Sequence, residues 1–365
     1  MTGGTVGKSY LVEHLDEPMY VNQRVATIKI LNPLEIKYIN TVILSDITQK
    51  IIKYSKNSTN DNISMDTIKG FLFPLPPLSE QGRIVKKIEE LEPFIEEYGK
   101  AEVKLTTLNS NFPEQIKKSI LQYAIQGKLV EQDPSDEPAS VLLEKIKAEK
   151  QELIKQGKIK KDKQESYIFK GADNRHYEKI GTETKDITDE IPFEIPESWE
   201  WCRLGSIVYN HGQKTPDKTF VYIDIGSIDN SHQQLSDKET ILTSKQAPSR
   251  ARKIIKKGDI IYSTVRPYLH NTCIIDRDFS LEPIASTGFA VLSVFSGIYN
   301  KFLFYYLISS SFDAYANDTE NSKGVAYPAI NDNRLYKALI PIPPLDEQKR
   351  IVDKITKLYE IIKNL

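Results

Sequence analysis

The chain of 365 residues is 39% hydrophobic and 27% charged, and its 49 basic and 50 acidic residues give a net charge of −1. These values are typical of a globular protein with two or three domains, and the balanced charge gives no global sign of nucleic-acid binding. Two cysteines are too few for a disulfide scaffold and no apolar run is long enough to cross a bilayer, so we exclude secreted, membrane and disulfide-rich classes and expect a cytoplasmic protein.

The first part of the chain, residues 1–73, is predicted to form short strands and one helix. Residues 25–30 have the β-branched content of a strand, and residues 36–50 carry apolar residues at helical spacing.

A long helix is predicted after the prolines at 74, 76 and 77, which end regular structure. Ser79 is placed to cap it. Pro93 predicts a kink or a break in this helix, and Phe112-Pro113 predicts a turn before a second helix over residues 114–126.

The rest of the chain is predicted to contain helices, a linker and strands in turn. A turn at 133–138 precedes a third helix that extends to Gly157, and residues 158–194, which are polar and lysine-rich and then mixed, are interpreted as a partly ordered linker. Strands are predicted between 199 and 294, followed by an aromatic helix over 299–315. We expect the aromatic residues of this helix, and the two tryptophans at 199 and 201, to pack in the core.

The chain contains an internal repeat. Residues 71–91 return as residues 338–358, and from position 74 onwards 12 of 18 aligned residues are identical. Both copies include Pro-Pro-Leu-x-Glu-Gln, at 76–81 and at 343–348. We therefore predict two copies of one unit, a mixed domain followed by a proline turn and a long helix. The first copy is expected to lack its beginning, and the last helix to be short.

Apolar residues recur in both helices at alternating spacings of four and three, which is typical of a coiled-coil seam. The two helices are therefore predicted to pack as a pair through Ile84, Ile88, Leu91, Ile351, Ile355, Leu358 and Ile362.

These segments resemble the specificity subunits of Type I restriction-modification systems. The resemblance rests on the two Pro-Pro-Leu-x-Glu-Gln turns, on residues 120–149, which are similar to the central conserved region, and on residues 196–205, which are similar to the start of a recognition domain.

The resemblance implies an α+β fold in which target recognition domains are joined by long antiparallel coiled-coil helices. It implies five regions: the C-terminal part of a first recognition domain (1–73), a helical spacer (74–157), a linker (158–194), a second, complete recognition domain (195–340) and the start of a second conserved helix (341–365).

The resemblance also implies function. A subunit of this family reads a bipartite sequence in double-stranded DNA, has no catalysis of its own, and docks methyltransferase subunits and a nuclease/translocase subunit. S-adenosylmethionine, ATP and Mg²⁺ are then expected on those partners and not on this chain. Self-association, or pairing with a complementary fragment, is a further expectation.

A basic run without an acidic residue extends from 245 to 257 and is the first candidate for DNA contact. Lys and Arg supply most phosphate contacts, although the solvated surface of a hairpin is the alternative interpretation. Its members are Lys245, Arg250, Arg252, Lys253, Lys256 and Lys257.

The loop at 264–271, between two apolar strands, is the second candidate. Arg266 suits guanine, Asn271 suits adenine, and Tyr268 can stack on a base or pack against protein. An ordinary connecting loop is the alternative. Lys8 belongs to the equivalent loop of the first copy.

A third polar segment precedes the second proline turn. Lys323, Asn331 and Arg334 are its candidate DNA contacts, and Lys56 is the counterpart in the first copy. A flexible loop is an equally good interpretation of this segment.

Signs of catalysis are absent from the sequence. It has no Asn/Asp-Pro-Pro-Tyr/Phe motif of adenine methyltransferases, and its five histidines show no metal-ligand spacing. The rival hypotheses are a silent or recombined specificity cassette, a coiled-coil interaction scaffold that does not bind DNA, and an enzyme fragment.

Overall fold

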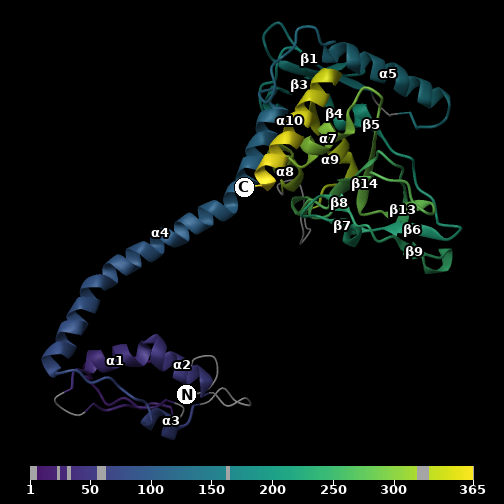
Figure 1. The fold of residues 1–365 in the computed structure, drawn as a ribbon. Helices are drawn as coiled ribbons and strands as arrows, with labels where there is room; N and C mark the ends of the chain where they lie inside the picture. Colours follow the sequence, from purple (N-terminus) through teal and green to yellow (C-terminus); the bar gives the residue numbers. More distant parts are fainter. Residues whose placement is uncertain are drawn as a thin grey trace. The chain divides into compact units, whose positions relative to one another are not determined.

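A computed structural model describes residues 6–22, 25–30, 34–55, 63–161, 165–318 and 329–364. The chain divides into two units, residues 1–110 and residues 111–365, and the boundary lies within the longest helix (Figure 1). Helices occur in both units and several sheets in the second, so the predicted α+β class is confirmed.

The first unit is built from three short helices and the beginning of a long one. Tyr38, Ile39 and Val85 form its buried cluster, because the apolar faces of the first and the long helix meet there. The helices are α1 (Ile36–Leu44), α2 (Asp46–Tyr54), α3 (Met65–Lys69) and α4 (Leu78–Ile125).

The helical pattern over residues 36–50 is confirmed by α1 and α2, which are separated at Ser45. The predicted strand at residues 25–30 is wrong. A strand needs a hydrogen-bonded neighbour, and no strand is assigned among the described residues of the first unit. Val25 and Ile28 stay largely exposed there, so the β-branched composition is not matched by burial.

The long helix α4 runs without interruption through Pro93 and Pro113 (Figure 1). The predicted turn at Phe112-Pro113 is therefore wrong, and no break occurs at Pro93. A proline costs a helix interior about 3 kcal/mol, but helix propagation is cooperative and the flanking Glu, Lys, Leu and Gln residues favour the helix. The helix begins at Leu78, so Ser79 is its second residue and not its cap.

The sheets of the second unit cross its core in two main layers. One has the strand order β10-β13-β6-β9 and the other β12-β11-β14-β5, and their pairs are antiparallel except for β13 with β6. The predicted strands near 222, 260, 273 and 290 are confirmed. The bounds are β4 (Glu200–Arg203), β5 (Val208–Tyr209), β6 (Phe220–Ile223), β7 (Ile228–Asp229), β8 (Gln234–Leu235), β9 (Thr240–Leu242), β10 (Ala251–Ile254), β11 (Ile260–Ser263), β12 (Thr272–Ile274), β13 (Pro283–Ser286), β14 (Phe289–Val294) and β15 (Leu339–Ile342).

Helices cover these sheets, and aromatic residues fill the space between them. Phe302 and Phe312 are buried, as are Trp199 and Trp201, so the predicted core role of these side chains is confirmed. Cys202 in β4 and Cys273 in β12 are buried free thiols. The helices of this unit are α5 (Ala139–Lys155), α6 (Leu204–Ile207), α7 (Asn300–Leu307), α8 (Ser310–Asn317), α9 (Asp332–Tyr336) and α10 (Leu345–Lys363).

Most of residues 158–194 is folded, so their interpretation as a linker is wrong. They form a three-stranded antiparallel sheet of β1 (Ser166–Lys170), β2 (His176–Ile180) and β3 (Glu183–Asp186). Ile168 and Ile187 pack on Trp201. All of β3 is exposed and β1 buries only one residue, and this low burial explains why the composition is as polar as that of a linker.

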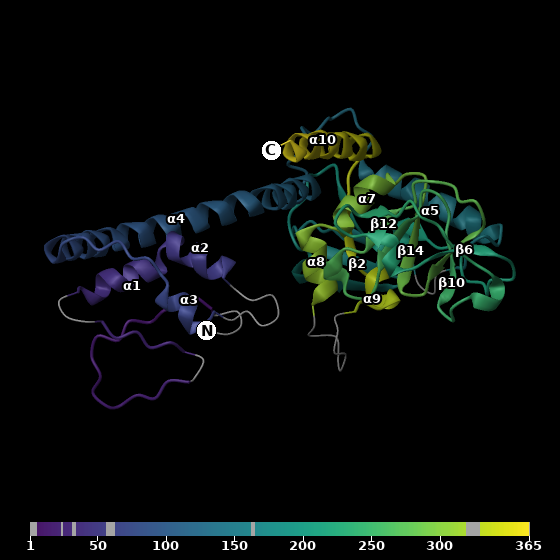
Figure 2. The same ribbon diagram turned by 60° about the horizontal axis from the view of Figure 1, so that its bottom comes forward.

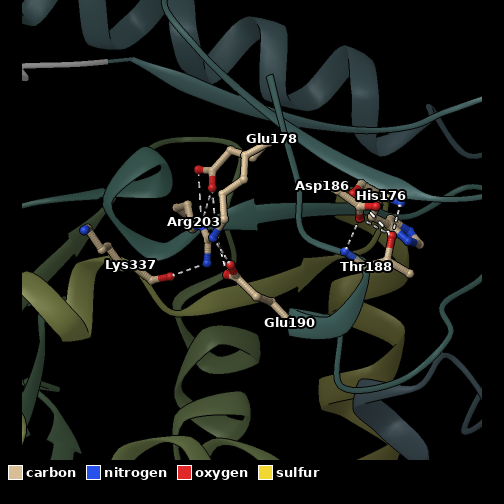
Figure 3. Close-up of polar contacts among 8 residues, drawn as sticks. His176, Glu178, Asp186, Thr188, Glu190, Arg203 and Lys337 are labelled. Atoms are coloured by element: carbon tan, nitrogen blue, oxygen red, sulfur yellow. Dashed lines mark hydrogen bonds and ion pairs between the residues drawn. The ribbon is translucent and has the colours of Figure 1, made fainter. Parts of the chain in front are cut away.

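A buried ion pair fastens this sheet to β4 (Figure 3). Arg203 Nη2 lies 2.6 Å from Glu178 Oε2 and 2.9 Å from Glu190 Oε2, and Arg203 Nη1 donates to the Lys337 carbonyl at 2.8 Å. Burial alone would raise the pKa of Glu178, but the Arg203 guanidinium holds that pKa below its usual value. The sheet, β4 and the chain before β15 are thus held together by one side chain.

The last turns of α4 pack along α10, which lies beside them in both views (Figures 1 and 2). Ile351 and Ile355 are buried against Leu121 and Ala124. The residues of the predicted coiled-coil seam have different surroundings. Ile84 packs in the buried cluster of the first unit, whereas Ile88 and Leu91 are exposed. Leu358 is half-buried and Ile362 buried.

The internal repeat is also a structural repeat. The residue before α1, Glu35, has φ −81° and ψ 112°, and its counterpart before α7, Tyr299, has φ −80° and ψ 111°. Ser64 caps α3 by accepting from the Thr67 N–H, and its counterpart Asn331 caps α9 by accepting from the Arg334 N–H. Thus α1, α2 and α3 of the first unit correspond to α7, α8 and α9 of the second.

The glutamine of the repeated proline motif makes the same bonds in both copies. Gln81 accepts from the Glu35 N–H at 3.0 Å and donates to the Pro76 carbonyl at 2.8 Å. Gln348 accepts from the Tyr299 N–H at 2.8 Å and donates to the Pro343 carbonyl at 3.0 Å. Gln81 therefore links its proline turn to the start of α1, and Gln348 links its proline turn to the start of α7. We call this arrangement the glutamine clamp.

Within the described ranges, no helix is long and apolar enough to cross a membrane. In the same ranges, no three His, Cys, Asp or Glu side chains come together in a group that could hold a metal ion.

Candidate DNA interface

The basic run at 245–257 is divided between two ends of the second unit. Ala251, at the start of β10, pairs with Ser286, and Ser263, at the end of β11, pairs with Phe289. Arg250 therefore lies at the turn between β13 and β14. Lys256 and Lys257 lie in the connection from β10 to β11, at the opposite end of these strands.

Half of the run already has partners within the protein. The Lys253 Nζ lies 3.8 Å from Asp332 Oδ2, the Lys257 Nζ lies 3.2 Å from Asp278 Oδ2, and Arg252 donates to the Ala251 carbonyl at 3.0 Å. The other three, Lys245, Arg250 and Lys256, are exposed, and no side-chain partner is recorded for them among the described residues. Of these three, only Arg250 lies at the turn between β13 and β14, and it is the cation best placed to meet a phosphate there.

The loop at 264–271 is held in a fixed conformation. Arg266 and His270 both have φ near +50°, which is rare for residues other than glycine, and they bracket a 3-10 turn. The His270 Nε2 lies 2.8 Å and 2.9 Å from the two carboxylate oxygens of Asp313 in α8. The Asn230 side chain donates to the Leu269 carbonyl at 3.0 Å. The Thr264 N–H is held by the Gly288 carbonyl on the other side of the loop, so the half-exposed ring of Tyr268 is presented on a loop that is fixed at both ends.

Three segments converge on the turn between β13 and β14. The Thr287 N–H donates to the Arg250 carbonyl at 2.8 Å, the Thr264 N–H donates to the Gly288 carbonyl at 3.0 Å, and the Ile330 N–H donates to the Thr264 carbonyl at 2.9 Å. We call the resulting surface the loop face; it comprises residues 230–233, Arg250, residues 264–270, Thr287 and residues 329–331.

Asn271 and Arg334 are not placed for the DNA contacts that we predicted. Asn271 is buried, 7% exposed, at the start of β12, where its carbonyl accepts from the Ser263 N–H. The Arg334 guanidinium donates to the Asp318 carbonyl at 2.8 Å and lies 5.0 Å from the centre of the Tyr315 ring. Both side chains are held inside the fold, which a residue type alone cannot reveal. Asn331 is exposed, and its side chain serves as the cap of α9.

The remaining predicted residues lie elsewhere. Lys8 is exposed in the first unit. Lys56 and Lys323 fall outside the described residues.

The turn between β7 and β8 was missed by the sequence analysis. It adds Asn230, Ser231 and His232 to the loop face, and all three are exposed. Hydrogen bonds from the Ser231 hydroxyl, and then from His232, hold the pKa of Asp229 well below its usual value. The available signal was the polar run at 229–234 between Ile228 and Leu235. Such amide and hydroxyl groups suit base edges better than phosphates.

The repeated helices, the proline turns and the loop face together define a class of protein. Residues 1–105 and 196–365 match the family model described as the Type I restriction modification DNA specificity domain. These residues make up most of the chain, and the protein belongs to this family.

Individual relatives are specificity subunits. The chain is 33% identical over 260 residues to the Type I restriction enzyme EcoAI specificity subunit of Escherichia coli, covering 68% of this chain and 40% of that protein. It is 26% identical over 261 residues to the EcoEI subunit of the same organism, covering 68% and 41%. The chain thus spans about two fifths of the length of these curated relatives. Among solved structures, the HsdS subunit from Thermoanaerobacter tengcongensis matches 47% of this chain and 45% of that chain, with 36% identity and a TM-score of 0.43.

Proposed function

We propose that this chain is a DNA sequence-specificity subunit that reads part of its target with the loop face of the second unit. The observation that carries the proposal is that the turn of Thr287 and Gly288 is bonded both to exposed Arg250 and to Thr264, where the loop that carries exposed Tyr268 begins, in a chain of the specificity-domain family. Such a set of a cation, an aromatic ring and neutral hydrogen-bonding groups offers both phosphate and base contacts.

The subunit would perform no chemistry itself. Methyltransferase subunits and a nuclease/translocase subunit would dock on it and bind S-adenosylmethionine, ATP and Mg²⁺, and the complex would act in the cytoplasm on a bipartite site in double-stranded DNA. The exposed apolar side chains of α4 support self-association or pairing with a complementary fragment; they are Phe94, Ile95, Tyr98, Leu105 and Leu108.

The test is to co-express the full chain with its methyltransferase subunit and to map adenine methylation on a DNA library. Arg250→Ala combined with Tyr268→Ala should abolish methylation at the preferred motif, or relax its sequence. The matched control is Lys256→Ala with Lys257→Ala, at the opposite end of the strands. It should leave the motif unchanged. Equal effects of the two double variants would contradict the assignment of the loop face.

Salt dependence separates this function from a scaffold that does not bind DNA. Each lost phosphate contact lowers the slope of log K against log salt by about 1. Arg250→Ala should therefore reduce that slope by about 1 in a fluorescence anisotropy titration with duplex DNA. A complex that assembles but shows no DNA binding at low salt would favour the scaffold, and assembly without methylation would favour a silent cassette.

A further inference from the structure

The segment before the first proline turn has the sequence of a strand in the second copy, but no strand is assigned to it among the described residues. Residues 72–75 correspond to β15 at an offset of 267. No backbone hydrogen bond is recorded for the amides of Leu72, Phe73 and Leu75 within the described part of the chain. Leu72 is 89% exposed and Leu75 58%, although both are large and apolar. Exposed strand edges with apolar side chains are sites at which another strand pairs.

The second copy shows what covers the corresponding edge. Here β15 pairs antiparallel with β4, with Leu339 opposite Arg203 and Ile342 opposite Glu200. All four residues of β15 are buried as a result. The covering strand follows directly on Trp199.

Trp199 anchors that covering strand through the glutamate of the proline motif. Its Nε1 donates to Glu347 Oε2 at 2.9 Å, and its ring packs edge-on against Phe302. Glu347 is fully buried and also accepts from the Gln132 amide at 2.6 Å. A buried carboxylate needs such donors, so the glutamate is a receptor for the indole.

The first copy keeps this receptor without the indole. Glu80 corresponds to Glu347, and the described residues record no partner for its half-exposed carboxylate. Leu78 beside it is also exposed. The glutamine clamp of Gln81 is formed as in the second copy, so the proline turn already has the shape that the second copy uses to receive Trp199.

We propose that residues 72–80 of the first unit form a docking site for a strand of a separate polypeptide that begins with a tryptophan. The strand pairs with residues 72–75 and covers Leu72 and Leu75, and the indole N–H donates to the Glu80 carboxylate. This is strand addition with a side-chain anchor. The inference rests on the structural repeat and does not depend on the proposed DNA function.

The test adds a fluorescein-labelled peptide with the sequence of residues 195–205, in which serine replaces the cysteine, to the full chain. Fluorescence anisotropy should show saturable binding. Replacing the first tryptophan of the peptide with alanine should weaken binding at least tenfold, as should Leu75→Asp in the chain. Ile47→Asp, at an apolar position on α2 that is also exposed, is the matched control and should have no effect.

Hydrogen exchange locates the bound peptide. Binding should slow exchange of the amides of residues 72–75 and leave those of β15 unchanged. Three outcomes would overturn the proposal: no saturable binding, equal binding to the Leu75→Asp chain, or a dimer in light scattering that Leu75→Asp dissociates. The second result would mean that the peptide displaces β4, and the third that a second copy is the occupant.

Discussion

The two copies of the repeat share their local structure and differ in what covers them. Glu35 and Tyr299 have nearly identical backbone angles, and Gln81 and Gln348 make the same pair of hydrogen bonds. In contrast, Ile355 is 1% exposed and its counterpart Ile88 is 40% exposed. Caps and turns are therefore encoded within each copy, whereas burial depends on segments from elsewhere in the chain.

Removing the Arg203 ion pair, which holds β4 in place in the second copy, should have the largest effect on stability. Arg203→Leu leaves the buried Glu178 carboxylate without its cation, and breaking such a pair costs about 3–5 kcal/mol. The free energy of unfolding of the second unit, measured in urea, should fall by that amount. Hydrogen exchange in residues 339–342 should then approach that of residues 72–75.

The control for this variant is Arg175→Leu. Arg175 lies 2.7 Å from Asp186, but both side chains are exposed, so the change should cost less than about 1 kcal/mol. A similar loss in both variants would mean that the Arg203 ion pair does not fasten the sheet to β4.

The aligned isoleucines give the most direct comparison. Ile355→Ala opens a cavity between α10 and α4 and should destabilise the second unit by about 2–5 kcal/mol. Ile88→Ala removes a partly solvated side chain and should cost less than about 1 kcal/mol. Urea unfolding of the two variants measures the difference, and equal losses would show that Ile88 is covered in solution.

Removing the glutamine clamps should show a smaller contrast. Gln348→Ala leaves the Tyr299 N–H and the Pro343 carbonyl without partners in a buried site, at about 1–3 kcal/mol for each unmatched group. Gln81→Ala should cost the first unit less, because Pro76 is only half-buried and water can replace one bond. Hydrogen exchange at the first turns of α7 and α1 reports each loss separately.

The pH dependence of stability offers the smallest effect. Burial raises the pKa of Glu347, although hydrogen bonds from Trp199 and Gln132 oppose the shift. Because the folded pKa exceeds the unfolded one, protonation favours the folded state. This contribution is present below the unfolded pKa and is lost as the pH rises through the folded pKa. Glu347→Gln should flatten the stability profile across that window in thermal unfolding at a series of pH values.

Much of the fold could be predicted from patterns that act over a few residues. The repeat, the proline turns, α5 and the buried aromatic residues of α7 and α8 all follow from local signals. The strand predicted at residues 25–30 is wrong because strand pairing depends on a distant neighbour, which local composition does not reveal. The sheet at 166–186 was missed because its strands bury few residues and so have a polar composition.

The candidate site was less predictable than the fold. Arg250 and Lys256 belong to one basic run but lie at opposite ends of β10, because the chain reverses between them. The Arg334 guanidinium has the right chemistry to bind DNA, but it instead donates to the Asp318 carbonyl and packs over the Tyr315 ring. The polar turn at Asn230 joins the loop face through a bond to a residue 39 positions away. Such convergence is a tertiary property that spacing along the sequence does not contain.

The two thiols of the chain can report how often two different pairs of strands open. Burial raises the pKa of the Cys273 thiol to about 12, and it also raises the pKa of Cys202. Only the thiolate reacts with an alkylating reagent, so each cysteine stays inert until its strand opens. Cys202 would time the separation of β4 from β15, and Cys273 the separation of β12 from β11. Alkylation followed by mass spectrometry would therefore record two opening rates within the second unit without any engineered label.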